Sequence, residues 1–370
     1  MIGAAPAGTR QVSAATAAAF GIVAQSGGGQ GGAGGDADNG DKKSAGGSGV
    51  AGGRGGSVGI TNRADIKTAV GGAIVAQSIG GFGGSGGAIA ITNSGRLTIG
   101  SATAAACEGG TTPPCNPAGM AGIAAQSVGG GGGAGGFARA TSTTAFGGSA
   151  HAVGGSGGAG GSGSKITVLN SGSIGTVEIN SAGILAQSIG GGGTAVAVGW
   201  VRLGGGGIVF DGANRVVQGA GGGGRAGWVN VSVNASIQTY GTGSTGIISH
   251  STTDPIITIV PGVSGTGGPG GSALRLDSPV NQITNAGHLT TRDGAAGQTV
   301  RTLSGDTTFT NKGVLTGSVT LAQGGANSCA TWPRAPSTPA RRSTWAAARR
   351  TMPACWAMAA RWARPSSPDR

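Results

Sequence analysis

Residues 165–192 run KITVLNSGSIGTVEINSAGILAQSIGGG, and this stretch contains three short β-branched segments separated by two turns. Apolar residues alternate with small or polar ones, as in half-buried strands, at Ile166, Val168, Ile174, Val177 and Ile179. The Asn-Ser-Gly at 170–172 predicts a turn, because Asn and Gly tolerate positive φ. Three strands and their corners, repeated, describe one circuit of a parallel β-helix, in which each circuit pairs with its neighbours.

Two motifs of this stretch recur along the chain. The AQS block, GILAQSIGGGG from Gly183, has four copies, with glutamine at Gln25, Gln77, Gln126 and Gln187. A fifth, decayed copy is GIISHS from Gly246, where His250 replaces the glutamine. The corner motif has six copies, which are ITNRADI from Ile60, ITNSGRL from Ile91, VLNSGSI from Val168, VSVNASI from Val231, ITNAGHL from Ile283 and FTNKGVL from Phe309. We expect its asparagines to stack into a hydrogen-bonded ladder.

The composition excludes a conventional globular core. Glycine contributes 85 of 370 residues, aromatic residues 4% and charged residues 10%, and glycine loses the most backbone entropy on ordering. A narrow lumen filled by Ile, Val, Leu and Ala needs few large side chains. We therefore predict an all-β parallel β-helix or solenoid with long glycine-rich loops and a disordered C-terminal tail. The glycine runs, of which 137–163 is the longest, are expected to be flexible loops or extended excursions from one side.

Three segments follow from these patterns: an Ala-rich segment 1–20 that could be an internal start, a glycine-rich repeat solenoid 21–325, and an Arg/Trp/Pro/Ala tail 326–370. The tail lacks the repeat pattern. Its codons, read two bases later, can restore Asn-Gly repeats, and we interpret the tail as the product of a frameshift. The alternative is an unrelated disordered basic tail.

The net charge of +12 does not indicate nucleic-acid binding. Eight arginines lie in 329–370, and the other cations are scattered, with Lys42 and Lys43 as the only adjacent pair. A nucleic-acid footprint is a clustered stripe interleaved with aromatic residues. The chain also has no apolar stretch long enough for a membrane-spanning helix, and its N-terminus does not resemble a signal peptide.

Residues that could carry chemistry are isolated from one another. No glycine motif continues into the Gly-Lys-Ser/Thr of a phosphate loop or lies between a strand and a helix. An acidic patch could hold a cation weakly or be a solvated loop, and consists of Asp36, Asp38 and Asp41. The other candidates lack metal or triad spacing and are His151, His250, His288, Glu108 and Glu178. We therefore assign no catalytic, cofactor-binding or metal-binding residue and expect no cofactor.

Two cysteines bracket an insertion. Cys107 and Cys115 enclose EGGTTPP and could close a small loop through a disulfide in an oxidising compartment. The alternative is two free thiols in a loop.

The AQS block and the corner motif together resemble the glycine-rich passenger domains of bacterial autotransporters, the type V secretion family, over about residues 20–325. The resemblance implies a β-helical passenger that is exported through a C-terminal outer-membrane barrel to the cell surface, or secreted. It also implies roles in adhesion, virulence, host-surface contact or self-association. The chain lacks a recognisable signal peptide and that barrel, so we expect a truncated fragment.

The sequence thus predicts a non-enzymatic, surface-exposed structural or adhesive passenger fragment. One alternative is a carbohydrate-active β-helix enzyme, which an acid cluster on one face would favour. Another is a different glycine-rich surface repeat protein, of the mycobacterial type, which would carry GGAGG tracts throughout.

Overall fold

The structure is a computed structural model. It describes residues 11–14, 20–31, 37–39, 43–45, 48, 50–69, 71–100, 121–132, 138–142, 151–153, 158–191, 199–203, 207–208, 224–251, 256–259 and 264–331. These residues form β-strands and one 3₁₀ helix, η1 (Gly294–Ala296). None of the described segments is a helix long and apolar enough to cross a membrane. The expected N-terminal segment lies mostly, and the tail beyond residue 331 wholly, outside the described residues.

Most strands belong to three eight-stranded parallel sheets. Sheet I contains β5 (Val58–Asn62), β8 (Ile89–Asn93), β13 (Ile166–Asn170), β18 (Val229–Val233), β21 (Ile256–Ile259), β24 (Val280–Asn285), β27 (Asp306–Asn311) and β30 (Ser328–Thr331). Sheet II contains β1 (Gln11–Ala14), β6 (Asp65–Thr68), β9 (Leu97–Ile99), β14 (Ile174–Thr176), β19 (Ile237–Thr239), β22 (Ser264–Gly267), β25 (His288–Thr291) and β28 (Val314–Leu315). Sheet III contains β2 (Ile22–Gly27), β7 (Ile74–Ile79), β10 (Ala121–Val128), β15 (Ala182–Ile189), β20 (Thr245–Ser251), β23 (Leu274–Asp277), β26 (Gln298–Thr302) and β29 (Ser318–Thr320).

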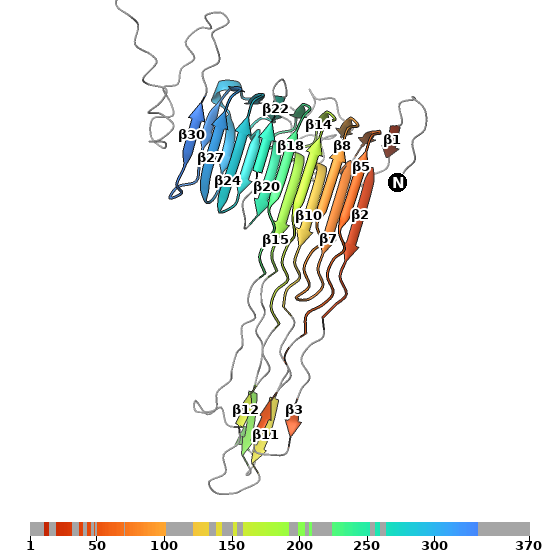
Figure 1. The fold of residues 1–370 in the computed structure, drawn as a ribbon, viewed down its shortest axis with the longest axis vertical. Coiled ribbons are helices and arrows are strands. Elements are labelled where there is room, and N and C mark those ends of the chain that lie inside the picture. Colours follow the sequence, from red (N-terminus) through yellow and green to blue (C-terminus); the bar gives the residue numbers. More distant parts are fainter. Residues whose placement is uncertain are drawn as a thin grey trace, which may run out of the picture.

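The chain visits the three sheets in a fixed cyclic order. A strand of sheet I is followed by one of sheet II and one of sheet III, and we call each such passage a circuit. Within every sheet the strands lie side by side in chain order, so each circuit pairs with the one before and the one after (Figure 1). The predicted all-β class with parallel sheets is confirmed. Pairing extends past both ends of the predicted 21–325 region, because β1 lies in sheet II and β30 in sheet I.

The core consists of β-branched and aliphatic side chains that face inward from all three sheets. In sheet III, Ile74, Ile123 and Ile184 are each fully buried and lie at the same register on neighbouring strands. Equivalent columns run through sheet I at Ile91 and Val168 and through the other strands. Phe309 is the one aromatic side chain in the buried core of the described residues. Repetition of short aliphatic columns thus replaces the large side chains that this chain lacks.

The circuit predicted over residues 165–192 has the expected three strands, β13, β14 and β15. One part of the predicted alternation is wrong. Strand β14 ends at Thr176, and Thr176 and Glu178 are buried, whereas Val177 and Ile179 are only half-buried. The chain leaves sheet II after three residues and turns through Asn180, whose φ is 53°.

The glycines of the Asn-x-Gly corners have a different role from the predicted one. Among the described residues with positive φ, neither Gly95 nor Gly172 occurs. A Cβ on Gly172 would instead lie well inside 3.0 Å of the backbone oxygen of Gly95, and a Cβ on Gly95 would meet the oxygen of Ala64. These corners need glycine because successive circuits approach each other closely, not because the backbone is left-handed.

Two smaller sheets lie apart from the three large ones, at the end of the glycine-rich segments (Figure 1). A four-stranded sheet has the order β17-β16-β11-β3, with β17 antiparallel, and a two-stranded sheet pairs β12 with β4. Their strands are β3 (Ala37–Asn39), β4 (Lys43–Ala45), β11 (Ala138–Ser142), β12 (His151–Val153), β16 (Gly199–Leu203) and β17 (Gly207–Ile208). The excursions emerge on one side of the circuits, as predicted.

The glycine segments that lead to and from these small sheets form an ordered assembly. An unbroken series of backbone hydrogen bonds, 2.7–3.0 Å long, joins outgoing and returning segments in alternation. We call the residues of this series the glycine array; they are Gly29, Gly53, Gly81, Gly84, Gly130, Gly161, Gly191 and Gly224. Of the two alternatives left open by the sequence, these residues have the arrangement of extended excursions.

Glycine is required at most positions of the array because a Cβ there would collide with the backbone of a neighbouring segment, although Gly29 has open space at this point. A Cβ on Gly130 would lie well inside 3.0 Å of the oxygen of Gly81, its equivalent one circuit earlier. The same holds for Gly191 against Gly130, and for Gly161 against Gly84 in the returning segments. The array is therefore packed backbone against backbone.

Candidate interaction surface

Sheet III presents an outer face made of three parallel rows of side chains. The four AQS strands β2, β7, β10 and β15 pair in register, so that equivalent residues stack from circuit to circuit. The middle row is Gln25, Gln77, Gln126 and Gln187, which we call the glutamine column. The flanking rows are Val23, Val75, Ala124 and Leu185 on one side and Gly27, Ile79, Val128 and Ile189 on the other. We call these twelve residues the glutamine face.

The amides of the glutamine column are hydrogen-bonded to one another. Gln25 Nε2 donates to Gln77 Oε1 (2.5 Å), Gln77 Nε2 to Gln126 Oε1 (2.6 Å) and Gln126 Nε2 to Gln187 Oε1 (2.8 Å). A primary amide has two N–H donors and two acceptor lone pairs. Each inner glutamine therefore keeps one donor and one acceptor for a further partner.

The flanking rows are apolar and partly open to solvent. Val23 is 49% exposed and Ile79 is 45% exposed, and the other aliphatic members are half-buried. None of the twelve residues is charged. The glutamine face is thus a neutral strip in which one amide row lies between two apolar rows.

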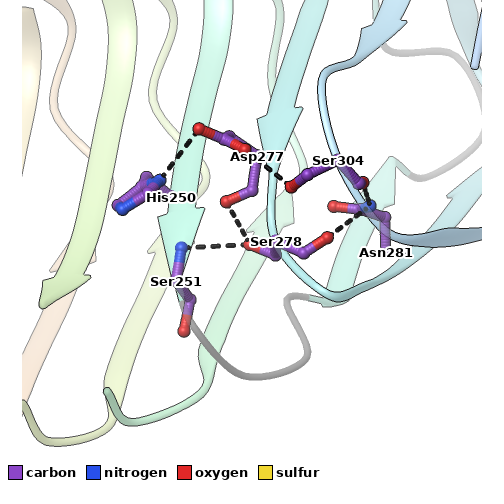
Figure 2. Close-up of polar contacts among 6 residues, drawn as sticks. All are labelled: His250, Ser251, Asp277, Ser278, Asn281 and Ser304. Carbon is purple, nitrogen blue, oxygen red and sulfur yellow. Dashed lines mark hydrogen bonds and ion pairs between the residues drawn. The ribbon is translucent and has the colours of Figure 1, made fainter. Parts of the chain in front are cut away.

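The glutamine column ends at a different polar group (Figure 2). His250 follows Gln187 in register, which confirms that it occupies the glutamine position, and Asp277 follows on β23. His250 Nδ1 lies 3.3 Å from Asp277 Oδ2, and both side chains are about one-third to two-fifths exposed (35% and 41%). Beyond Gln187, side chains at the glutamine position therefore still contact each other between circuits, but through a histidine and an aspartate.

Asp277 and its neighbours form a connected network rather than a catalytic triad. The hydroxyl of Ser304 donates to Asp277 Oδ1 (2.6 Å), so serine and histidine contact the same carboxylate from two sides (Figure 2). In a catalytic triad the serine hydroxyl instead bonds the histidine ring. Asn281 Nδ2 donates to the backbone oxygens of Ser278 (3.1 Å) and Ser304 (2.9 Å), which ties two successive corners together.

A serine column behind the glutamine face connects the body to the glycine segments. Ser78 Oγ donates to the oxygen of Gly56 (2.8 Å) and accepts from the N–H of Gly87 (2.7 Å). Ser127 Oγ likewise donates to Gly87 (2.9 Å) and accepts from Ser164 (2.8 Å). Ser78, Ser127 and Ser188 thus each link the returning segments of two successive circuits, whereas, within the described residues, Ser26 accepts from Gly56 alone.

The predicted asparagine ladder is confirmed in part of sheet I. Asn62 Nδ2 donates to Asn93 Oδ1 (2.7 Å), and Asn93 Nδ2 donates to Asn170 Oδ1 (2.8 Å). All three are buried. Val233 occupies the next position and interrupts the ladder, which resumes where Asn285 donates to Asn311 (2.7 Å).

The acidic side chains of the described residues also serve contacts between circuits. Asp65 Oδ1 accepts from the N–H of Arg96 (2.7 Å) and Asp306 Oδ1 from that of Ala326 (2.6 Å). Asp293 Oδ2 accepts from the N–H of Gly270 (2.7 Å). Glu178 is buried inside the circuits. The carboxylates of Asp65, Asp293 and Asp306 thus link successive circuits.

The remaining residues singled out by sequence are dispersed. His288 begins β25 and its Nε2 lies 3.1 Å from Thr316 Oγ1. His151 and Asp38 lie in β12 and β3, in two different small sheets. Within the described residues, no three His, Cys, Asp or Glu side chains gather as a metal site would require. The structure does not describe the other predicted positions, which are Asp36, Asp41, Glu108, Cys107 and Cys115.

The sequence pattern missed the roles of the glutamines and serines of the AQS block. Their recurrence marked the repeat, but a repeat alone does not say which side of a strand faces out. The signal was the alternation within Ala-Gln-Ser, since period two places alanine and serine inside and glutamine outside. Comparison of the chain with protein-family models, curated proteins and solved structures gave no match.

Proposed function

We propose that this chain is a parallel β-solenoid that acts as a non-enzymatic structural and adhesive module. The cyclic order of the three sheets supports the solenoid. The observation that carries the functional proposal is the use of polar side chains. Glutamine, asparagine, serine and aspartate contact their equivalents or the backbone of the next circuit, and so build a continuous scaffold.

The glycine array gives this scaffold a second feature suited to display. It holds the small sheets apart from the three large ones, on one side of the circuits (Figure 1). A hydrogen-bonded stalk that carries short strands at its far end suits contact with another surface. The resemblance to autotransporter passengers supports placing this contact at the cell exterior, and we include surface exposure in the proposal.

The experiment is a bead-attachment assay with the full chain. Latex beads coated with the chain, and beads coated with serum albumin as control, are applied to a cultured epithelial cell layer under flow. We expect more attachment with the chain-coated beads. In parallel, the chain is incubated with pectin and chitin, and newly formed reducing ends are measured. Attachment equal to that of albumin, or steady release of reducing ends, would contradict the proposal.

A further inference from the structure

We infer that the glutamine face binds a second copy of this chain, through a twofold axis that runs along the glutamine column. The inference rests on the proposed structural and adhesive function, and it names the partner that the glutamine face would bind. The argument comes from the symmetry, the charge, the hydrogen bonding and the size of the face.

The three rows make the face complementary to itself. A twofold axis along the middle row places the amides of one copy on the amides of the other. It also places the row of Val75 over the row of Ile79, so that apolar side chains meet apolar side chains. Because the strands pair in register, this match repeats from β7 to β15, while at β2 Val23 would face Gly27, which has no side chain.

Hydrogen bonding favours the same partner. Each inner glutamine retains one donor and one acceptor after its ladder bonds. A second column offers the complementary acceptors and donors at the same spacing of about 4.8 Å, which is the distance between neighbouring strands. Stacked amide rows of this kind occur where identical sheets pack face to face.

The absence of charge on the glutamine face disfavours charged partners. The chain carries a formal net charge of +12, which disfavours the approach of a second copy in general. The glutamine face has no charge, whereas the same outer rows carry His250, Arg275, Asp277 and Arg301 on the following strands. A charged partner gains nothing over the neutral strip, and a second copy avoids repulsion there.

The size of the face predicts a weak interaction. The face is four strands wide, at about 4.8 Å per strand, and six residues long, at about 3.3 Å per residue, which gives an area of roughly 400 Å². A standard stable interface covers about 800 Å² on each partner. Single pairs should therefore dissociate readily, and the contact gains strength where many copies are displayed together.

The first test is sedimentation velocity of the full chain from about 1 µM to about 1 mM, a range that covers weak interfaces. We expect reversible dimers at the upper end. Val23→Lys with Ile79→Lys leaves every ladder residue in place and should raise the dissociation constant about tenfold or more. The matched control is Thr61→Lys with Thr92→Lys on exposed positions of sheet I, which should dimerise like the parent chain. A monomeric parent chain, or equal weakening by both pairs, would overturn the inference.

The second test addresses the twofold arrangement. Val75 of one copy should face Ile79 of the other, so Val75→Glu and Ile79→Lys should each weaken self-association. An equimolar mixture of the two variants should recover it, because the introduced carboxylate of one copy then meets the introduced ammonium group of the other across the interface. Failure of the mixture to recover, with both variants folded by circular dichroism, would contradict this arrangement. Bead attachment to cells that survives loss of self-association would leave the proposed function standing.

Discussion

The body, by which we mean sheets I, II and III, and the glycine array share the same spacing between circuits. Side chains fill the space inside the body, whereas backbone atoms fill the space within the array. In the body, inward side chains occupy the lumen, and the column that passes through Ile74, Ile123 and Ile184 continues with leucine and valine at Leu274 and Val300. In the array, the oxygen of one glycine occupies the place of the next glycine's Cβ. The body tolerates exchange among aliphatic residues, whereas most positions of the array have no room for a Cβ.

The two regions should also differ in how their stability arises. The body removes apolar surface from water, which stabilises the fold by about 25 cal/mol per Å². The array buries almost no side chain and relies on backbone hydrogen bonds, each worth about 0.5–1.5 kcal/mol net. Glycine also loses the most conformational entropy on ordering. We therefore expect the array to open locally while the body remains folded.

The largest expected effect is in the body. Ile184→Ala removes a side chain that is fully buried in the inward column of sheet III, and should lower the free energy of unfolding by about 2–5 kcal/mol through lost burial and a cavity. Urea unfolding followed by circular dichroism measures it. The matched control is Leu185→Ala, the half-buried outward neighbour, which should cost about 1 kcal/mol or less. Equal effects would show that the lumen is not the main source of stability.

A smaller effect should follow from interrupting the asparagine ladder. Asn93 bonds both Asn62 and Asn170 in the buried column, so Asn93→Ala removes one acceptor from Asn62 and one donor from Asn170, which keep only their bonds to Ala64 and Gly172. The expected loss is about 1–3 kcal/mol in the same urea experiment. Asn234→Ala, at an exposed corner, is the control and should change the midpoint little. A neutral Asn93→Ala would mean that the ladder is not needed for stability.

The sequence predicted the body well because its signals are local. Alternating Ile and Val with Asn-x-Gly corners indicate strands and turns, and the recurrence of both motifs indicates parallel pairing. The asparagine ladder also followed, since identical residues at one corner must stack. The inward positions at and after the end of β14 could not be predicted, because the buried Thr176 and Glu178 are polar whereas the half-buried Val177 and Ile179 are apolar.

The arrangement of the array could not be predicted, because glycine has no side chain and a run of glycines therefore shows no alternation of apolar and polar residues. The run 129–133 is compatible with a flexible loop, a left-handed turn or a close approach. The structure has the close approach. Contacts between residues up to 78 positions apart in the chain produce it, such as the bond that Ser164 Oγ donates to the oxygen of Gly86. The small sheets likewise depend on pairing across circuits, as where Ala37 pairs with Ala138.

Within the array, adding one methyl group should act locally. Gly130→Ala forces a Cβ against the oxygen of Gly81, and such overpacking costs about 1–3 kcal/mol. Hydrogen exchange by mass spectrometry should then speed up in residues 80–87 and 158–164 and stay unchanged in β13 and β14. Gly59→Ala is the control, because a Cβ on this exposed strand glycine meets nothing within 4 Å. Faster exchange throughout the body would show that the two regions unfold together.

The smallest effect tests the connection between the two regions. Ser127 lies in a body strand and bonds Gly87 and Ser164, which lie on returning segments of two circuits. Ser127→Ala removes these bonds and takes only a hydroxyl from the inward side of the strand, and should lower stability by about 1 kcal/mol while exchange rises in residues 158–164. Ser94→Ala, on an exposed corner that bonds the oxygen of Asn62, controls for loss of a hydroxyl. If Ser127→Ala loosens the array but leaves the urea midpoint of the body unchanged, the serines anchor the array to a body that is stable by itself. If both loosen to the same extent, the serine column makes one cooperative unit of two regions that pack by different means.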